Sequence, residues 1–226
     1  MSIKENLEGI TEKIGKKSEL VGRNPREITL VAVTKTVEAD RVEEAIVAGV
    51  NIIGESRVQE AKEKYRKVKS KVVWHLVGHL QRNKAKDAVK IFDLIHSVDN
   101  AKLAKEIDKQ ARKIGKIQKI LIEVNVSGEE SKYGLSPEKV IAFLQEVSVL
   151  PNVKIEGLMT MAPLGENPED SRPYFRKLKE LLEEAKSKNI ENMEMVYLSM
   201  GMSNDFEVAI EEGSNMVRIG RAIFGP

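Results

Sequence analysis

Short runs of Val, Ile and Leu alternate along the chain with longer stretches in which hydrophobic residues recur at helical spacing. Short runs of this kind are typical of strands in a parallel sheet, and the longer stretches are typical of amphipathic helices. The pattern predicts strands at residues 28–33, 51–53, 72–77, 94–97, 119–124, 154–158, 194–199 and 216–219. It predicts helices between them at residues 38–48, 56–68, 82–90, 100–114, 137–147, 168–188 and 205–212.

Eight strands in strict alternation with helices predict an α/β protein with a single (β/α)₈ barrel of the TIM type. The run at 51–53 is the shortest, and without it an open sheet would be expected. An amphipathic segment at residues 3–21 precedes the first strand, and the sequence ends seven residues after the last one. We therefore expect this extra N-terminal helix to fill the place of an eighth outer helix. No Gly/Ser-rich linker interrupts residues 1–226, so a single domain is predicted.

Composition narrows the classes of partner. The 37 Lys and Arg residues nearly balance the 35 Asp and Glu residues, so the net charge of +2 gives no strong field for nucleic acid or an anionic membrane. There is no cysteine, which excludes disulfides, thiolate metal sites and a cysteine nucleophile. No apolar stretch is long enough for a signal peptide or a membrane span. We therefore expect a cytoplasmic protein without nucleic-acid or membrane partners.

In a barrel of this class, reactive groups lie at the carboxyl ends of the strands. The first predicted strand reads ITLVAVTK and ends at Lys35. At the end of an apolar run, loss of solvent disfavours a charged ammonium and favours the nucleophilic amine, which forms a Schiff base with an aldehyde. The plainer alternative is a lysine that extends from the strand end into water.

The last two predicted strands end in loops suited to a phosphate group. Their sequences are SMGMSN, at residues 199–204, and RIGRA, at residues 218–222. Barrels commonly hold phosphate there with main-chain N–H groups that glycine leaves accessible. Strands one and eight are neighbours in a closed barrel, so an amine on one and a phosphate loop on the other can hold one small cofactor. Pyridoxal 5′-phosphate (PLP) has both the aldehyde and the phosphate.

Arg218 adds a constraint on the chemistry. PLP sites place a protein group opposite the ring nitrogen. A permanent positive charge there opposes protonation of the nitrogen and makes the ring a poor electron sink. If Arg218 takes that place, decarboxylase and transaminase chemistry are disfavoured.

Several segments carry a resemblance to a known family. They are VAVTKT, GESRVQE, WHLVGHLQRNK, HSVD, VNVSGEESKYG, GLMTMAP, LSMGMSNDFEVAI and VRIGRAIFG. Together they resemble the pyridoxal phosphate homeostasis proteins (the YggS/PROSC type) and, more distantly, the N-terminal barrel of alanine racemase. The resemblance implies that Lys35 is the Schiff-base lysine. It also implies cofactor-binding roles for Ser199, Gly201, Ser203, Arg218, Gly220 and Arg221. Of these, Gly220 and Arg221 are expected to offer main-chain N–H groups.

The same resemblance implies a carrier and regulator of PLP, active in vitamin B6 and amino-acid balance, with amino acids and PLP-dependent apo-enzymes as further partners. One position departs from the family pattern, since Ser56 stands where an asparagine is usual. A PLP-dependent racemase-like enzyme remains the alternative. Alanine racemase takes its second base from a tyrosine of a separate C-terminal domain, and we expect no such domain here. An aldolase that uses Lys35 on a sugar phosphate is a third hypothesis.

The other residues near predicted strand ends are not expected to take part in chemistry. His75 and His79 flank a predicted strand end without a third ligand, so no metal site is expected. Trp74 is expected in the barrel core and His75 at its mouth. Glu55 and Glu123 are expected to pair with nearby lysines rather than with each other as acid and base. The expected walls of the pocket are His96, Asn125 and Met159.

Overall fold

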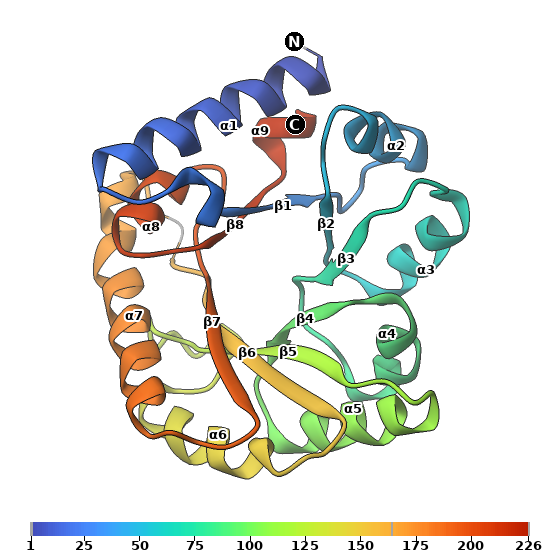
Figure 1. Cartoon of the computed structure of the whole chain (residues 1–226), viewed down its shortest axis with the longest axis vertical. Coiled ribbons are helices and arrows are strands. Elements are labelled where there is room, and N and C mark those ends of the chain that lie inside the picture. Colours follow the sequence, from blue (N-terminus) through green and yellow to red (C-terminus); the bar gives the residue numbers. More distant parts are fainter. Residues whose placement is uncertain (1, 164, 226) are drawn as a thin grey trace.

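Eight parallel strands form a closed barrel in chain order, in a computed structural model that describes residues 2–163 and 165–225 (Figure 1). The first strand pairs with the last through the partners Thr29 and Met216 and through Val31 and Arg218. The predicted (β/α)₈ fold is therefore confirmed, including the short second strand. The strands are β1 (Thr29–Val33), β2 (Ile52–Glu55), β3 (Val73–Leu76), β4 (Leu94–Val98), β5 (Gln118–Glu123), β6 (Val153–Met159), β7 (Met193–Ser199) and β8 (Met216–Ile219).

Helices surround the barrel, and each predicted helix has a counterpart. They are α1 (Ile3–Leu20), α2 (Ala39–Val47), α3 (Val58–Lys67), α4 (Ala85–Ile91), α5 (Ala101–Lys113), α6 (Val140–Ser148), α7 (Arg172–Ser187), α8 (Phe206–Glu211) and α9 (Arg221–Phe224). Short 3₁₀ turns were not predicted; these are η1 (Pro25–Glu27), η2 (Arg82–Lys84), η3 (Pro137–Lys139) and η4 (Pro168–Ser171).

The N-terminal helix α1 packs against α8, α9 and α2, and so closes the outer ring as expected (Figure 1). Its buried face consists of residues at helical spacing, which are Ile3, Leu7, Ile10 and Ile14. Asn6 donates from Nδ2 to the carbonyl of Ile223 at 2.9 Å and ties α1 to α9. The short helix α9 was not predicted, because the segment after β8 is too brief to show a helical period.

Two apolar clusters separate the inside of the barrel from its helical shell. The buried apolar side chains of the interior are Val31, Val77, Leu94, Leu121, Met159 and Met216. Trp74 belongs to the outer cluster, where its ring meets the edge of Tyr65 on α3 at a centroid distance of 5.3 Å. The expectation that Trp74 fills the barrel core is wrong. Successive strand residues face opposite sides, so the inward position on β3 belongs to His75.

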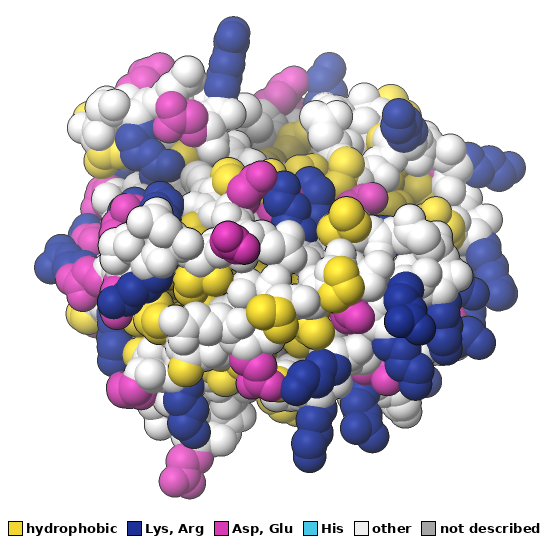
Figure 2. Space-filling model, turned by 60° about the horizontal axis from the view of Figure 1, so that its bottom comes forward, with side chains coloured by type: hydrophobic (Ala, Val, Ile, Leu, Met, Phe, Trp, Pro, Cys, Tyr) yellow, Lys and Arg dark blue, Asp and Glu magenta, His cyan; other side chains and the backbone are white. Residues whose placement is uncertain are grey.

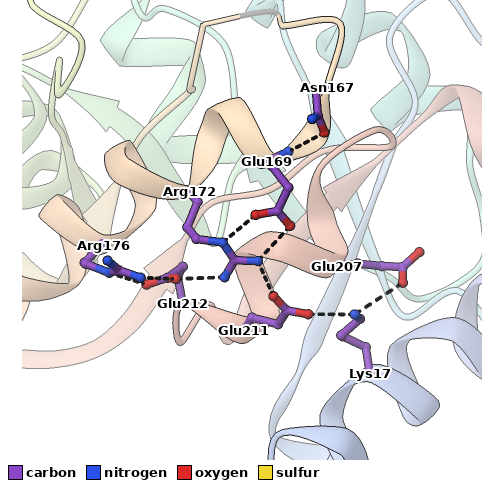
Figure 3. A network of polar contacts seen from close by, with 8 residues as sticks. All are labelled: Lys17, Asn167, Glu169, Arg172, Arg176, Glu207, Glu211 and Glu212. Atoms are coloured by element: carbon purple, nitrogen blue, oxygen red, sulfur yellow. Dashed lines mark hydrogen bonds and ion pairs between the residues drawn. The ribbon is translucent and has the colours of Figure 1, made fainter.

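Charged side chains of both signs are intermingled on the face drawn in Figure 2, with hydrophobic side chains between them. An ion network joins three helices at one side of the barrel (Figure 3). Arg172 on α7 contacts Glu169, Glu211 and Glu212, and Lys17 on α1 lies 2.7 Å from Glu211. Across residues 2–163 and 165–225, every helix is too short or too polar to cross a membrane.

Candidate functional site

A cavity of ≈ 530 Å³ opens at the carboxyl ends of the strands. Its lining includes Lys35 beyond β1, Ser56 beyond β2, and residues 202–205 beyond β7. Strand β8 and the turn after it contribute Arg218, Gly220 and Arg221. Lys35 and the two glycine-containing loops therefore share one cavity, although they are far apart in sequence.

Lys35 is exposed to this cavity and lies two residues beyond the end of β1. The expected loss of solvent at this lysine is wrong, because its side chain is exposed at the cavity. The residues on either side of Lys35, Thr34 and Thr36, are held by hydrogen bonds. Thr34 donates from its hydroxyl to Glu55 Oε1 at 2.6 Å, and the Thr36 N–H donates to Glu60 Oε1 at 2.6 Å. Thr36 has a φ of 63°, so the chain turns sharply just after the lysine.

Lys64 on α3 links these contacts into one network. Its ammonium donates to the Thr34 carbonyl at 2.5 Å, to Glu55 Oε1 at 2.8 Å and to Glu60 Oε1 at 2.7 Å. Burial raises the pKa of Glu55, and the hydrogen bonds from Lys64 and Thr34 oppose that rise. The expected pairing of Glu55 with a lysine is confirmed. Sequence reasoning did not identify Lys64, which looks like one of many solvated helix lysines.

Two loops present unpaired main-chain donors to the cavity. Within the described residues, the N–H groups of Ser203, Asn204, Gly220 and Arg221 donate to no protein acceptor. Buried or clustered N–H groups ordinarily find a partner, so four free donors around one cavity suit an anionic ligand. At Gly220 an added Cβ would lie 3.1 Å from the Val33 carbonyl oxygen, so this turn passes close to β1.

Asp205 holds the loop after β7 in place. Its carboxylate accepts from the Met202 N–H at 2.6 Å and from the Ser171 hydroxyl at 3.1 Å. Gly201 has a φ of +93°, and a Cβ there would lie 2.6 Å from the Ala209 Cβ. Gly201 therefore packs against α8 behind the loop and does not line the cavity.

Arg218 projects from β8 into the barrel and is buried. Its Nη1 donates to the Ser199 hydroxyl at 2.6 Å, and its Nη2 donates to the Thr160 carbonyl at 2.8 Å. Burial lowers the pKa of Arg218 to about 10, while Glu123 and Asp205 oppose that fall, so the side chain remains a cation at neutral pH. Ser199 is fully buried beneath the cavity and contacts the arginine rather than the open space.

The histidines lie elsewhere than expected. His75 and His96 are both buried inside the barrel, and His96 Nε2 lies 3.1 Å from His75 Nδ1. His79 instead stacks on Tyr133 at a centroid distance of 3.8 Å. The expectations of His75 at the mouth and of His96 as a cavity wall are therefore wrong. Within residues 2–163 and 165–225, no cluster of three His, Cys, Asp or Glu side chains is arranged to hold a metal ion.

Three further expectations need correction. Met159 lies in the apolar interior, and Asn125 folds onto its own loop, where Nδ2 donates to the Glu129 carbonyl at 2.9 Å, so neither is a cavity wall. Glu123 has no lysine partner in the described part of the chain, and its Oε2 is buried without a hydrogen bond. Burial raises the pKa of Glu123 to about 7; Asp99 adds to the rise and Arg218 opposes it.

Comparison with known proteins agrees with this architecture. Residues 3–226 match the family model described as alanine racemase, N-terminal domain. The chain is 46% identical over 226 residues to the pyridoxal phosphate homeostasis protein of Aquifex aeolicus (strain VF5), covering 100% of this chain and 98% of the relative. It is 37% identical over 235 residues to the protein of the same name from Homo sapiens, covering 97% of this chain and 84% of the relative.

Solved structures give the same result. PipY of Synechococcus elongatus PCC7942, solved with PLP bound, has a TM-score of 0.83 and 35% identity, covering 94% of this chain and 100% of that one. Alanine racemase of Clostridium difficile 630 has a TM-score of 0.79 at 16% identity, covering 100% of this chain and 56% of that one, and shares the fold alone. This chain therefore belongs to the family of pyridoxal phosphate homeostasis proteins, whose barrel matches the N-terminal domain of alanine racemase.

Proposed function

We propose that this chain binds PLP as a Schiff base on Lys35 and acts in vitamin B6 and amino-acid homeostasis rather than as a high-turnover enzyme. One observation carries the proposal: an exposed lysine, four unpaired main-chain donors and a buried arginine are grouped around one cavity. Its volume of ≈ 530 Å³ is in the usual range for small-molecule sites. The names of the relatives and the PLP bound in PipY support the choice of ligand.

Each group has a distinct role in this proposal. The Lys35 amine would hold the cofactor through its aldehyde, as a Schiff base formed with loss of one water. The N–H groups of Ser203, Asn204, Gly220 and Arg221 would bind the phosphate, and Arg218 would bind at the ring nitrogen. Ser199 and Gly201 act from behind, the first by contact with Arg218 and the second by allowing the turn.

The lining also favours holding the cofactor over turning over a substrate. The ionisable side chains among the described lining residues are Lys35, Glu166, Asp205, Arg218 and Arg221. The Asp205 carboxylate accepts from Met202 and Ser171, and a guanidinium group is a hydrogen-bond donor only. A racemase needs bases on both faces of its substrate, and no Tyr or His side chain of the described lining stands opposite Lys35.

The covalent link is tested by absorbance and chemical trapping. Purified protein mixed with PLP is expected to show a visible Schiff-base band, and borohydride followed by peptide mass spectrometry is expected to find pyridoxyl label on Lys35. Lys35→Ala should lose both signals. Lys86→Ala, a change at an exposed lysine of α4, is the matched control and should keep them. Label on another lysine, with none on Lys35, would contradict the proposal.

A racemase-like activity is tested separately. The holo-protein is incubated with L-amino acids in heavy water, and the α-hydrogen is followed by mass spectrometry. The homeostasis proposal predicts no exchange beyond the rate of free PLP. Rapid exchange that Lys35→Ala abolishes would instead identify an enzyme. A protein that shows no pyridoxal band even with added PLP would favour an aldolase.

A further inference from the structure

A line of buried polar side chains crosses the barrel beneath the cavity. It starts at Arg218, whose Nη1 donates to the Ser199 hydroxyl at 2.6 Å. The Ser199 oxygen lies 3.1 Å from His96 Nδ1, and His96 Nε2 lies 3.1 Å from His75 Nδ1. The line therefore runs over strands β8, β7, β4 and β3, among apolar side chains of the barrel interior.

The arginine determines the direction of the first hydrogen bond in this line, and the Ser199 proton then selects an arrangement for the rest. A guanidinium is a donor only, so Ser199 accepts from Arg218 and has its own proton to give. The arrangement that gives the Ser199 proton an acceptor has Ser199 donating to His96 Nδ1, which is then unprotonated. The remaining proton of His96 is on Nε2 and is donated to His75 Nδ1. Both histidines are therefore in the Nε2–H tautomer, each as the partner of the side chain before it.

The electrostatics agree with this assignment. Burial, reinforced by the charge of Lys119, lowers the pKa of His75 to about 3. Burial also lowers the pKa of His96 well below its usual value, and His75 and Arg218 add to that fall. Each ring is thus neutral near pH 7 and has one N–H, as a one-way chain of donors requires. Arg218 is the one cation among the four side chains of this line.

We propose that Ser199, His96 and His75 are positioning residues that fix the guanidinium of Arg218 against the bound cofactor. Ser199 holds Nη1 while the Thr160 carbonyl holds Nη2, so the plane of the guanidinium is determined by two contacts made on the barrel side. Three of its five N–H groups are left for other partners. His96 keeps the Ser199 hydroxyl oriented as an acceptor for the arginine, and His75 keeps His96 in the required tautomer.

Only the contact of Arg218 with a bound cofactor rests on the proposed function, so the first test uses the protein without cofactor. The chain has three histidines, so ¹⁵N NMR of histidine-labelled protein gives three ring systems, which single variants assign. The Nε2–H tautomer is expected for His75 and His96. A proton on Nδ1 of either ring would overturn the proposal, whatever the protein binds.

The second test measures the bound PLP. His96→Leu removes the acceptor for Ser199, so the visible band should shift by several nanometres and PLP should dissociate several-fold faster, because the charge near the ring moves. His96→Asn places an amide oxygen close to the position of Nδ1 and should restore both values. His79→Gln, a change at the histidine outside the line, is the matched control.

A third comparison separates positioning from folding. Ser199→Ala should reproduce the effects of His96→Leu, and the double variant should show no larger effect than either single one, since both act through the same hydroxyl. If His96→Leu does not fold, Ser199→Ala alone tests the proposal. A folded Ser199→Ala protein with an unchanged band and an unchanged PLP release rate would overturn the proposal. If wild-type protein shows no PLP band while both tautomers are as expected, the proposed function fails and the hydrogen-bond line stands.

Discussion

Lys64 donates from its ammonium to the main-chain carbonyl of Thr34, the residue that precedes the exposed lysine of the cavity. The same ammonium neutralises Glu55, which is fully buried. A lysine on α3 therefore determines both the position of the chain at the end of β1 and the charge balance beneath it. Because a buried ion pair is costly to break, this contact should be visible in stability as well as in ligand binding.

Lys64→Met is expected to destabilise the protein by about 3–5 kcal/mol, because it leaves the Glu55 carboxylate buried without its partner. Urea unfolding of the cofactor-free protein measures the loss. Lys62→Met on the same helix is the matched control: Lys62 pairs with Asp87 in a partly exposed contact of 3.0 Å, worth about 0–1 kcal/mol. Adding Glu55→Gln to Lys64→Met should recover part of the loss. Equal stability of the Lys64 and Lys62 variants would contradict this account.

Glu123→Gln should change stability in a pH-dependent way. Burial raises the pKa of Glu123 to about 7, from 4.5, so its contribution is fully present below pH 4.5 and is lost as pH rises through 7. Glutamine cannot ionise, so the variant should gain on the wild type by about 3 kcal/mol between pH 4.5 and pH 8. Comparing urea unfolding at the two pH values cancels any constant cost of the amide. A stability difference that does not vary with pH would contradict the buried, unpaired state of this carboxyl.

His75 should contribute to acid unfolding. Burial lowers the pKa of His75 to about 3, so below about pH 6.5 the unfolded chain binds a proton that the native protein does not. Stability is complete above that pH and falls by about 1.4 kcal/mol per pH unit as pH decreases toward 3. His75→Gln should reduce the slope of stability against pH in this window. Identical slopes for wild type and variant would indicate that His75 is protonated in the native protein.

The elements of the fold were predictable because hydrophobic runs of strand length recur along the whole sequence. The inner face of a strand was harder to assign, since an error of one residue exchanges its two faces. This error placed Trp74 inside the barrel and His75 at the mouth. The pair of His75 and His96 depends on how β3 and β4 are staggered, which no local pattern gives. Lys64 was missed for a related reason: its partner Thr34 is 30 residues away, and the pairing of β1 with β2 brings them together.

The cavity residues divide in the same way. Lys35, Ser203, Gly220 and Arg221 could be proposed because the ends of barrel strands are where ligands bind. Ser199 and Gly201 belong to the same sequence motif, yet they lie behind the loop. A motif indicates which segment forms a site. The direction of each side chain follows from the twist and packing of the strand that carries it.

Arg172 offers a final prediction about stability. It pairs with Glu169, Glu211 and Glu212, and it follows Ser171, whose hydroxyl donates to Asp205 in the loop after β7 (Figure 3). The hydrogen bonds that Arg172 donates to these glutamates raise its pKa, so the network stays ionised. Arg172→Gln should cost about 1–2 kcal/mol, more than an isolated surface pair, and 1 M salt should reduce the difference.

The matched control is Lys179→Gln, which breaks one exposed pair with Glu183 on the same helix and should cost well under 1 kcal/mol. Thermal unfolding of both variants in low and high salt measures the comparison. Because α7 and the loop after β7 are joined through Ser171 and Asp205, Arg172→Gln should also weaken PLP binding, by roughly two- to fivefold, the equivalent of about 0.4–1 kcal/mol. Unchanged affinity together with reduced stability would show that the network supports the helices alone and that the loop is held by Asp205 without it.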